Sequence, residues 1–230
     1  MKKLFIFDFD GTLVKEDILD VICEIVGKKE ESRIINEKFI KGQLKTLKDT
    51  ICARINFLKN VSSTEIEEKL NQNNYLRQGT IELFKYLKEN NFITVLCSGN
   101  IMPVLEYYKK LLGIDYVLGT NPIMNGNKID YIDETCFKNK EFKFESCKEI
   151  IKKLNIDKEN IYAIGDSISD IKILSLAKHT FAVDPKSGIE KYANVIIKEN
   201  MNEIINYLKS WNYKKIPKYG IFEVYWKNFA

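Results

Sequence analysis

Short apolar runs alternate along this chain with segments whose apolar residues recur at helical spacing. Such runs are typical of strands that are covered on both faces of a parallel sheet. They occupy residues 4–7, 92–97, 116–118, 161–164 and 181–183. The helical patterns cover residues 80–89, 102–112, 145–154 and 168–177, with Thr80 as a plausible N-cap and Pro103 in a first turn. We therefore predict an α/β fold with a Rossmann-like, mostly parallel sheet.

Residues 16–74 interrupt this alternation, because they hold amphipathic helical patterns and no convincing strand. Thr64 and Glu67 have the spacing of a capping box within this stretch. We predict a small helical cap domain, residues 15–76, inserted into a discontinuous α/β core of residues 1–14 and 77–211. The alternative is a run of helices packed directly on a face of the sheet.

Two later segments also differ from the strand and helix alternation. Residues 121–132 contain Asn125-Gly126 between apolar residues, which predicts a β-hairpin with a tight turn. Residues 212–230 are rich in aromatic side chains. We expect this tail to dock on the core, and a self-association surface is the alternative.

The composition argues against several classes of protein. Of 230 residues, 36 are Lys or Arg and 32 are Asp or Glu, so a net charge of +4 is too small for a dedicated nucleic-acid binder. The five cysteines form no CxxC motif beside a single histidine, which favours free thiols over a zinc site. No segment approaches the ~20 apolar residues of a membrane span or has the form of a secretory signal. We expect a cytoplasmic protein without nucleic-acid or membrane partners.

Two pairs of acids follow predicted strands. Asp8 and Asp10 end the first run before Gly11, and Asp166 and Asp170 follow residues 161–164. Ligands of open α/β sheets bind at the carboxyl ends of the strands, where one carboxylate can act as nucleophile or metal ligand and another as acid or base. Helix capping is the alternative for either acid of the second pair. Oxygen ligands without nearby His or Cys favour Mg²⁺ over zinc.

Two weaker features could complete a phosphate site. Ser98-Gly99 follows the run at residues 92–97, just before a predicted helix, and could offer a hydroxyl and backbone N–H groups to an anion. Phosphoryl chemistry among several acids also needs a cation. The candidates before or early in the helix at residues 145–154 are Lys138, Lys140, Lys143 and Lys148, and position alone does not choose among them.

In chain order these elements read Asp8-Phe-Asp-Gly-Thr12, Ser98-Gly99, a lysine near 143, and Gly165-Asp166 followed by Asp170. The set resembles the haloacid dehalogenase superfamily, most of all its phosphoserine phosphatase-like branch, over residues 1 to about 182. The resemblance implies a Mg²⁺-dependent phosphomonoesterase that acts on a small phosphorylated metabolite through an aspartyl-phosphate intermediate. The dehalogenases of the superfamily lack an acid at the position of Asp10, so phosphoryl chemistry is favoured.

The resemblance also implies a role for each residue. Asp8 would attack phosphorus, and Asp10 would protonate the leaving alcohol and then activate water. Mg²⁺ would be held by Asp8, Asp166 and the backbone carbonyl of Asp10. The residues implied to bind the phosphoryl group are Thr12, Ser98, Gly99 and Lys143. Lys143 is preferred because it stands just before the helix at residues 145–154, and Asp170 would orient this lysine and the metal shell.

The match is thinner in the cap, where substrate is selected. Arg54 matches the arginine that binds the substrate carboxylate in the phosphoserine branch, while Asp17 stands where that branch usually has Glu. Leu47 replaces a larger apolar residue, and Asn100 replaces a second Gly. An acid for an ammonium and an arginine for a carboxylate would suit an amino-acid phosphate. Helix capping by Asp17 and a surface or cap–core salt bridge of Arg54 are the alternatives.

Other activities stay open at this point. The substrate could be another small phosphomonoester, such as phosphocholine, phosphoethanolamine, pyridoxal phosphate or a methionine-salvage intermediate. A phosphotransferase or phosphomutase would use the same Asp8, whereas a catalytically inactive binding module is disfavoured because the acids are intact. The resemblance implies a mobile cap with hinges near residues 14–15 and 74–78. We expect a monomer or homodimer.

Overall fold

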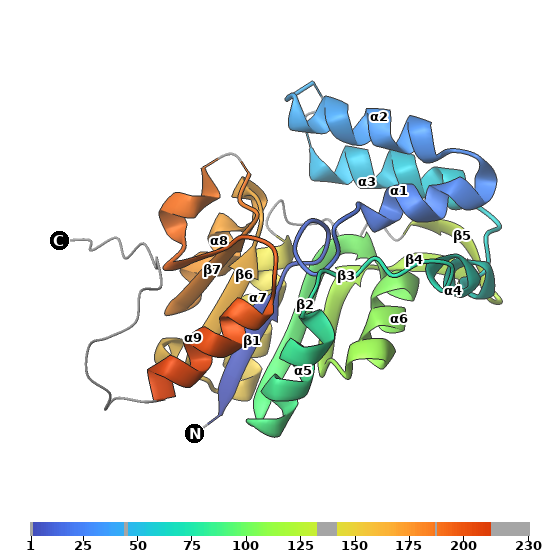
Figure 1. Cartoon of the computed structure of the whole chain (residues 1–230). Helices are drawn as coiled ribbons and strands as arrows, with labels where there is room; N and C mark the ends of the chain where they lie inside the picture. The colour runs from blue at the N-terminus through green and yellow to red at the C-terminus, as the bar shows by residue number, and fades with distance from the viewer. Residues whose placement is uncertain (1, 44–45, 133–141, 187, 213–230) are drawn as a thin grey trace.

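Six parallel strands form one sheet in the order β3-β2-β1-β6-β7-β8 (Figure 1). The structure is a computed structural model and describes residues 2–43, 46–132, 142–186 and 188–212. The strands are β1 (Lys3–Phe7), β2 (Phe92–Ile101), β3 (Tyr116–Thr120), β6 (Ile161–Gly165), β7 (His179–Val183) and β8 (Val195–Ile197). The predicted α/β fold is confirmed, and each of the five apolar runs lies in a strand. The pattern missed β8, because this edge strand has only three residues.

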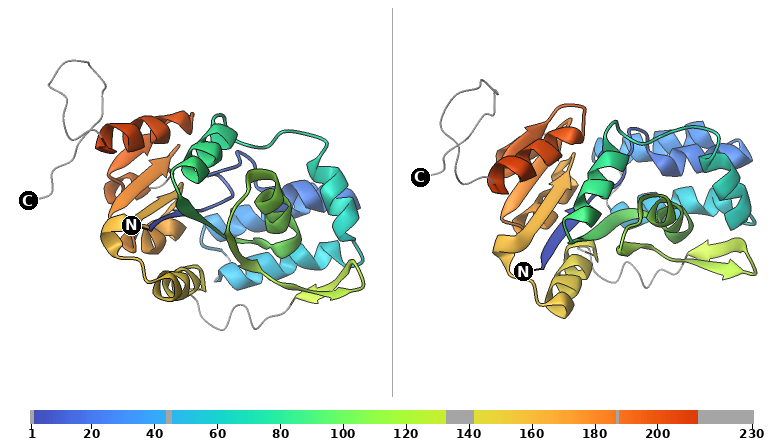
Figure 2. Two further views of the ribbon diagram at one scale, coloured as in Figure 1. Left: turned by 90° about the horizontal axis from the view of Figure 1, so that it is seen from below. Right: turned by 60° about the horizontal axis from the view of Figure 1, so that its bottom comes forward.

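Helices cover both faces of the sheet, because alternate residues of a strand point to opposite faces. Phe5 and Phe7 belong to a buried cluster with α5, α6 and α9, whereas Leu4 and Ile6 pack with α7 and α8 (Figure 2). The α-helices are α5 (Thr80–Glu89), α6 (Met102–Leu112), α7 (Phe142–Leu154), α8 (Ile171–Ser175) and α9 (Asn202–Asn212). Short 3-10 helices are η4 (Lys158–Asn160), η5 (Ile168–Asp170) and η6 (Ile189–Tyr192). The inner strands β1, β6 and β7 are thus buried on both sides, whereas the edge strands β3 and β8 are partly exposed.

Some predicted helix ends need correction. Thr80 is not the N-cap of α5, because Gly79 holds that position with a φ of 81° and the Thr80 hydroxyl donates to the carbonyl of Arg77. Helix α7 begins at Phe142, so Lys143 lies in its first turn rather than before it. The predicted helix at 168–177 divides into η5 and the short α8. Pro103 lies in the first turn of α6, as predicted.

Helices follow one another in the part of the insert that the structure describes, and they lie beyond the carboxyl ends of the strands (Figure 1). They are α1 (Ile18–Cys23), η1 (Glu24–Val26), α2 (Lys29–Ile40), α3 (Leu47–Ile55), η2 (Asn56–Leu58) and α4 (Ser63–Leu70). The capping box predicted for Thr64 and Glu67 is wrong. Ser62 caps α4, and Glu65 reaches back to the Ser62 backbone, so the box begins two residues earlier.

The predicted hairpin is present and consists of β4 (Pro122–Asn125) and β5 (Lys128–Ile132). It also pairs with the insert. The backbone N–H of Asn60 donates to the carbonyl of Ile129 over 2.7 Å, and the N–H of Ile129 donates to the carbonyl of Val61 over 2.9 Å. Residues from opposite halves of the chain are therefore joined by a short backbone ladder beside α4 (Figure 1).

The two linkers between insert and core lie side by side. Val14 and Leu76 form an antiparallel bridge, and the N–H of Arg77 donates to the carbonyl of Leu13 over 2.8 Å. Cys136 and residues 213–230 of the predicted tail lie outside the described residues. Cys23, Cys97 and Cys147 are free thiols. Across the described ranges, we find no helix with the length and apolar character to cross a bilayer.

Candidate active site

The first acid of each predicted pair stands where the strand order of the sheet reverses. Asp8 follows β1 and Asp166 follows β6, which are neighbours in the sheet. Ligands of such sheets bind at this switch point. Gly11 lets the loop after β1 approach β6, because its φ is +83° and a Cβ there would lie 2.2 Å from Oδ2 of Asp166. The conformation of Gly11 thus lets the loop after β1 pack closely against Asp166, so that Asp8 and Asp166 share one site.

Asp8 is held by hydrogen bonds at both carboxylate oxygens. The Thr12 hydroxyl donates to Oδ2 over 2.9 Å, and Nζ of Lys143 donates to Oδ1 over 2.7 Å. The same Nζ lies 3.2 Å from Oδ1 of Asp170. All of these groups are largely buried, so the ammonium of Lys143 is fixed between two carboxylates. These charges outweigh burial and raise the pKa of Lys143, which therefore stays protonated.

Three buried carboxylates form the centre of the site. Asp8, Asp166 and Asp170 each offer one oxygen, and these oxygens lie within 4.8 Å of one another. Burial, and then the charge of Asp170, raises the pKa of Asp8 to about 8. Burial likewise raises the pKa of Asp166, although Nζ of Lys186 lies 2.7 Å from its Oδ2. Three carboxylates against two lysines leave one negative charge in excess, and an oxygen-only donor set fits a hard divalent cation.

The carboxylate of Asp10 lies apart from that cluster. It accepts a hydrogen bond from the N–H of Ile18 over 2.8 Å, and from the Ser98 hydroxyl over 3.3 Å. Nδ2 of Asn100 donates to both of its oxygens, over 3.2 and 3.3 Å. Burial, and then the charge of Asp17, raises the pKa of Asp10 to about 7. A carboxyl with such a pKa can both give and take a proton near neutral pH.

Ser98 and Gly99 lie in the irregular last part of β2, not in a loop that follows the strand. The pairing of β2 with β3 changes register between Cys97 and Ile101. The N–H of Asn100 donates to the Ser98 hydroxyl over 3.0 Å, and the Thr120 hydroxyl donates to the carbonyl of Gly99. This bulged segment brings the Ser98 hydroxyl to Asp10.

The insert holds a second buried charge cluster, centred on Arg54. Its Nη2 donates to Asp17 over 2.5 Å and to Asp20 over 2.8 Å, and its Nε donates to the Ser32 hydroxyl. Asp17 is also the N-cap of α1, and its other oxygen accepts from Asn36. Burial opposes the charge of Arg54, but the two carboxylates outweigh it and raise the pKa of Arg54. The capping alternative for Asp17 is thus realised, whereas the salt bridges of Arg54 are buried within the insert and lie neither at the surface nor between cap and core.

The two clusters meet at the start of α1. Ile18, the first residue of α1, donates its N–H to Asp10, and it directly follows Asp17. The charges of Asp17 and Arg54 both act on the pKa of Asp10. The structure therefore brings Asp17 and Arg54 into electrostatic contact with the strand-end acids. For the Leu47 side chain, the structure gives no description.

Sequence reasoning missed two cations beside the site. Lys186, from the loop after β7, pairs with Asp166. Arg77, from the second linker, donates from Nε to the carbonyl of Thr12 over 3.1 Å and from Nη2 to the carbonyl of Gly11 over 2.8 Å. Arginine is scarce in this chain, which was the one available signal for Arg77, but nothing in its neighbourhood linked it to residues 11–12.

Comparison with known proteins identifies the family of this chain. The sequence model of the haloacid dehalogenase-like hydrolases matches residues 5–175. The phosphoserine phosphatase of Methanocaldococcus jannaschii is 28% identical over 209 residues, which are 90% of this chain and 98% of that protein. The chain therefore belongs to the haloacid dehalogenase-like hydrolases, and to their phosphoserine phosphatase-like branch, as its motifs predicted.

Two solved structures have the same fold. One is described as a phospho-aspartyl intermediate analogue of phosphoserine phosphatase, with a TM-score of 0.76 and 28% identity, covering 90% of this chain and 98% of the other. The other is a substrate-bound phosphoserine phosphatase complex, with a TM-score of 0.78, 27% identity and the same coverage. The likeness extends over nearly all residues that the structure describes.

Proposed function

We propose that this protein is a Mg²⁺-dependent phosphoserine phosphatase in which Asp8 is the nucleophile. The observation that carries the proposal is the carboxylate of Asp8, buried at the switch point and fixed between Thr12 and Lys143. A carboxylate in such a position can form a covalent intermediate with an electrophilic group. The choice of phosphoserine is supported by the names of the relatives and by the charges around Arg54.

Asp8 and Asp10 divide the chemistry between them. An oxygen of Asp8 attacks phosphorus, and the bond from phosphorus to the ester oxygen breaks while Asp10 gives its proton to that oxygen. A water molecule then attacks the phosphorus of the aspartyl phosphate and gives a proton to Asp10, and Asp8 leaves. The pKa of about 7 suits Asp10 to both proton transfers. Lys143 offsets the negative charge that the phosphoryl group brings to these acids.

Mg²⁺ would be held by Asp8, Asp166 and the backbone carbonyl of Asp10, with Asp170 beside them. When bound, it supplies positive charge that neutralises the phosphoryl oxygens. The fit rests on the three buried carboxylates and on the oxygen-only donor set of this cluster. Lys186 holds Asp166 from the exposed side of the site. Thr12 and Lys143 keep the Asp8 carboxylate oriented, and Ser98 and Gly99 would contact the phosphoryl oxygens.

Arg54 and Asp17 would bind the amino-acid part of the substrate. Nε and Nη2 of Arg54 are engaged within the insert, but its Nη1 donates to none of the described residues. This nitrogen could donate to a substrate carboxylate. Asp17 and Asp20 carry two negative charges against the single charge of Arg54, which suits a substrate ammonium.

The proposal includes a division of the chain into domains. We divide it into a core of residues 1–14 and 77–211 and a cap of residues 15–76, because the secondary-structure elements of the described part of that insert are all helices. The free thiols of Cys23, Cys97 and Cys147 are in keeping with a reducing cytoplasm. The protein acts as a monomer or homodimer.

The test is phosphate release from a panel of phosphorylated metabolites, with Mg²⁺ and with a chelator in its place. The panel holds phosphoserine, phosphothreonine, phosphocholine, phosphoethanolamine, sugar phosphates, nucleotides and pyridoxal phosphate. We expect the highest kcat/KM for phosphoserine and loss of turnover with the chelator. A maximum at another monoester would overturn the substrate but keep the mechanism, and no release from any of them would overturn both.

A further inference from the structure

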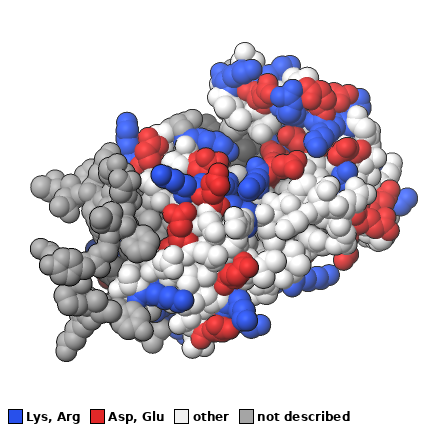
Figure 3. All heavy atoms as spheres, in the orientation of Figure 1, with Lys and Arg blue, Asp and Glu red and all other residues white. Residues whose placement is uncertain are grey.

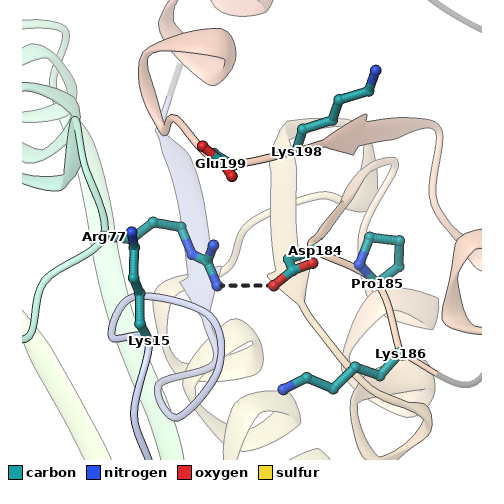
Figure 4. A pocket seen from close by; sticks show the side chains of 7 residues that line it. All are labelled: Lys15, Arg77, Asp184, Pro185, Lys186, Lys198 and Glu199. Atoms are coloured by element: carbon teal, nitrogen blue, oxygen red, sulfur yellow. Dashed lines mark ion pairs between the residues drawn. The ribbon is translucent and has the colours of Figure 1, made fainter.

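A cavity of about 430 Å³ lies where both linkers of the insert meet the loops that follow β7 and β8 (Figure 4). It is lined by Lys15, Arg77, Asp184, Pro185, Lys186, Lys198 and Glu199. Neither Asp8, Asp10, Ser98 nor Lys143 lines it, so the cavity lies beside the catalytic residues and not among them. Its size falls in the range of pockets that hold small molecules, roughly 300–1,000 Å³.

Cations outnumber acids in this cavity by four to two. Neither Lys15 nor Lys198 forms an ion pair with any residue of the described part of the chain. Lys186 is the only one of the three lysines with such a pair, to Asp166. Basic side chains gather at this junction on the surface as well, among several acids (Figure 3). Glu199 is likewise without an ion pair among the described residues and offsets one of these charges, so the lining presents a net positive charge from separate segments to one space.

Arg77 supplies the most buried of these cations, with only 5% of its side chain exposed. Its Nε and Nη2 donate to backbone carbonyls, which carry no net charge. Its nearest acid is Asp184, whose oxygen lies 3.9 Å away on a side chain that is 67% exposed. Nη1 donates to none of the residues that the structure describes. A buried guanidinium with a free donor is stabilised by an anion that brings both charge and hydrogen-bond acceptors.

We propose that this cavity is a binding site for a phosphate-class anion, either inorganic phosphate or a small organic phosphate. Arg77 would donate to the anion from Nη1. Lys15 and Lys198 stand on opposite sides of the cavity, and their flexible side chains would have to turn toward the anion to contact it (Figure 4). A doubly charged tetrahedral anion offers several acceptor oxygens, and so suits donors that come from different directions. The site is separate from the proposed catalysis and does not depend on it.

The position of the site gives the anion a consequence for the insert. Lys15 and Arg77 belong to the two linkers, whereas Lys198 belongs to a loop of the core. Arg77 also holds the carbonyls of Gly11 and Thr12, next to the catalytic acids. An anion that contacts both linkers and the core would couple its own binding to the placement of the insert.

The test is calorimetric titration with inorganic phosphate, and separately with methylphosphonate as an organic phosphate analogue that a phosphatase does not hydrolyse. The wild-type protein is compared with the double variant Lys15→Gln/Lys198→Gln. A matched control, Lys85→Gln/Lys153→Gln, removes the same charge from helices that do not line the cavity. We expect the cavity variant to lose one of the phosphate sites of the wild type, or to bind phosphate at that site at least tenfold more weakly. The control should keep both its number of sites and its affinities.

Equal binding by wild type and the cavity variant would overturn the proposal, and so would an equal loss in the control, since net charge alone would then explain it. A catalytic site that binds no phosphate would lower the number of sites in all three proteins, but the difference between the variants would remain. Failure of the proposed function is therefore distinguishable from failure of this site. If only inorganic phosphate titrates the cavity, the natural ligand is the free ion. If methylphosphonate binds there as well, the site takes organic phosphates.

Discussion

Two clusters of charges, one at the carboxyl ends of the strands and one in the helical insert, each hold one more acid than cation, but the two clusters are built differently. At the carboxyl ends of the strands, Asp8, Asp166 and Asp170 face two lysines, and the acids are close enough to share a cation. In the insert, one arginine is enclosed by Asp17 and Asp20. The first arrangement suits a small hard cation and the second a larger organic one, so the two clusters can select different parts of one substrate complex.

We expect the largest effect on activity from removal of the nucleophile, which changes the cluster at the strand ends and leaves the cluster around Arg54 in place. We expect Asp8→Asn to lower kcat by about 10³-fold or more on every phosphomonoester, because the amide keeps the shape but is a poor nucleophile. Phosphate release and circular dichroism measure activity and fold together. The control is Asp157→Asn, an exposed acid away from the site. Wild-type rates in the Asp8 variant would contradict the covalent mechanism.

The insert cluster should act mainly on substrate choice. We expect Arg54→Ala to lower kcat/KM for phosphoserine by about 10²-fold, because a charge-assisted pair to the carboxylate is lost, and to change that for an aryl phosphate far less. Arg33→Ala is the control, since Arg33 is exposed and, among the residues that the structure describes, forms ion pairs only with Glu30 and Glu37.

Arg54→Ala also leaves two buried acids without their cation, so its thermal unfolding must be measured in parallel. Equal losses on both substrates in a variant that stays folded would make Arg54 purely structural. Arg54→Lys keeps the charge but not the paired geometry, and should fall between the two.

The two acids that follow β1, Asp8 and Asp10, should make the stability of the metal-free protein depend on pH. The pKa values of Asp8 and Asp10 are raised to about 8 and about 7 from an ordinary 3.8. A carboxyl whose pKa is raised by folding favours the folded state at low pH, and this contribution is lost as pH rises through the folded pKa. We expect the free energy of unfolding of the metal-free protein to fall between about pH 4 and about pH 8, by at most about 1.4 kcal/mol per pH unit for each group, and to level off above about pH 8.

Denaturant unfolding of the chelator-treated protein tests this, with Asp8→Asn as the comparison. The variant should be more stable than the wild type above pH 8 and should show a flatter profile, because it has no charge to bury at that position. A difference between the two proteins that stays constant from pH 6 to 9 would contradict the raised pKa of Asp8.

The smallest expected effect concerns helix α4, where the structure and the sequence pattern disagree. Ser62→Ala should lower the free energy of unfolding by about 1 kcal/mol, because the capping box is lost. Thr64→Ala should leave stability nearly unchanged, since Thr64 is not the cap. The two variants are compared by denaturant unfolding, and the reverse order of stabilities would restore the box at Thr64 and Glu67.

The sheet and its acids could be predicted because their signals are local. A buried run that ends in Asp8 reports both a strand and its carboxyl edge, and the same holds for the run before Asp166. Lys143 was chosen among four lysines only through the family resemblance. The structure brings it to Asp8 and Asp170, in the first turn of a helix that begins earlier than its apolar pattern.

The remaining features depend on contacts that no local pattern records. Arg77 acts on backbone carbonyls of residues 11–12, which have no side-chain signature. Lys186 meets Asp166 only because the loop after β7 returns to the switch point. The cap of α4 was misplaced because Ser62, Ser63 and Thr64 all carry hydroxyls, and only the backbone conformation selects one of them.

The ladder between residues 60–63 and the β4–β5 hairpin has a consequence for how this fold can diversify. An insert joined to the core only through its two linkers could be exchanged between relatives as one continuous segment. Here Asn60 and Val61 pair with Ile129, so a transplanted insert would leave an unpaired strand edge unless the hairpin came with it. The insert and the hairpin therefore form one structural unit although they are separate in the sequence, and a chimera that keeps their pairing must take both segments from the same parent.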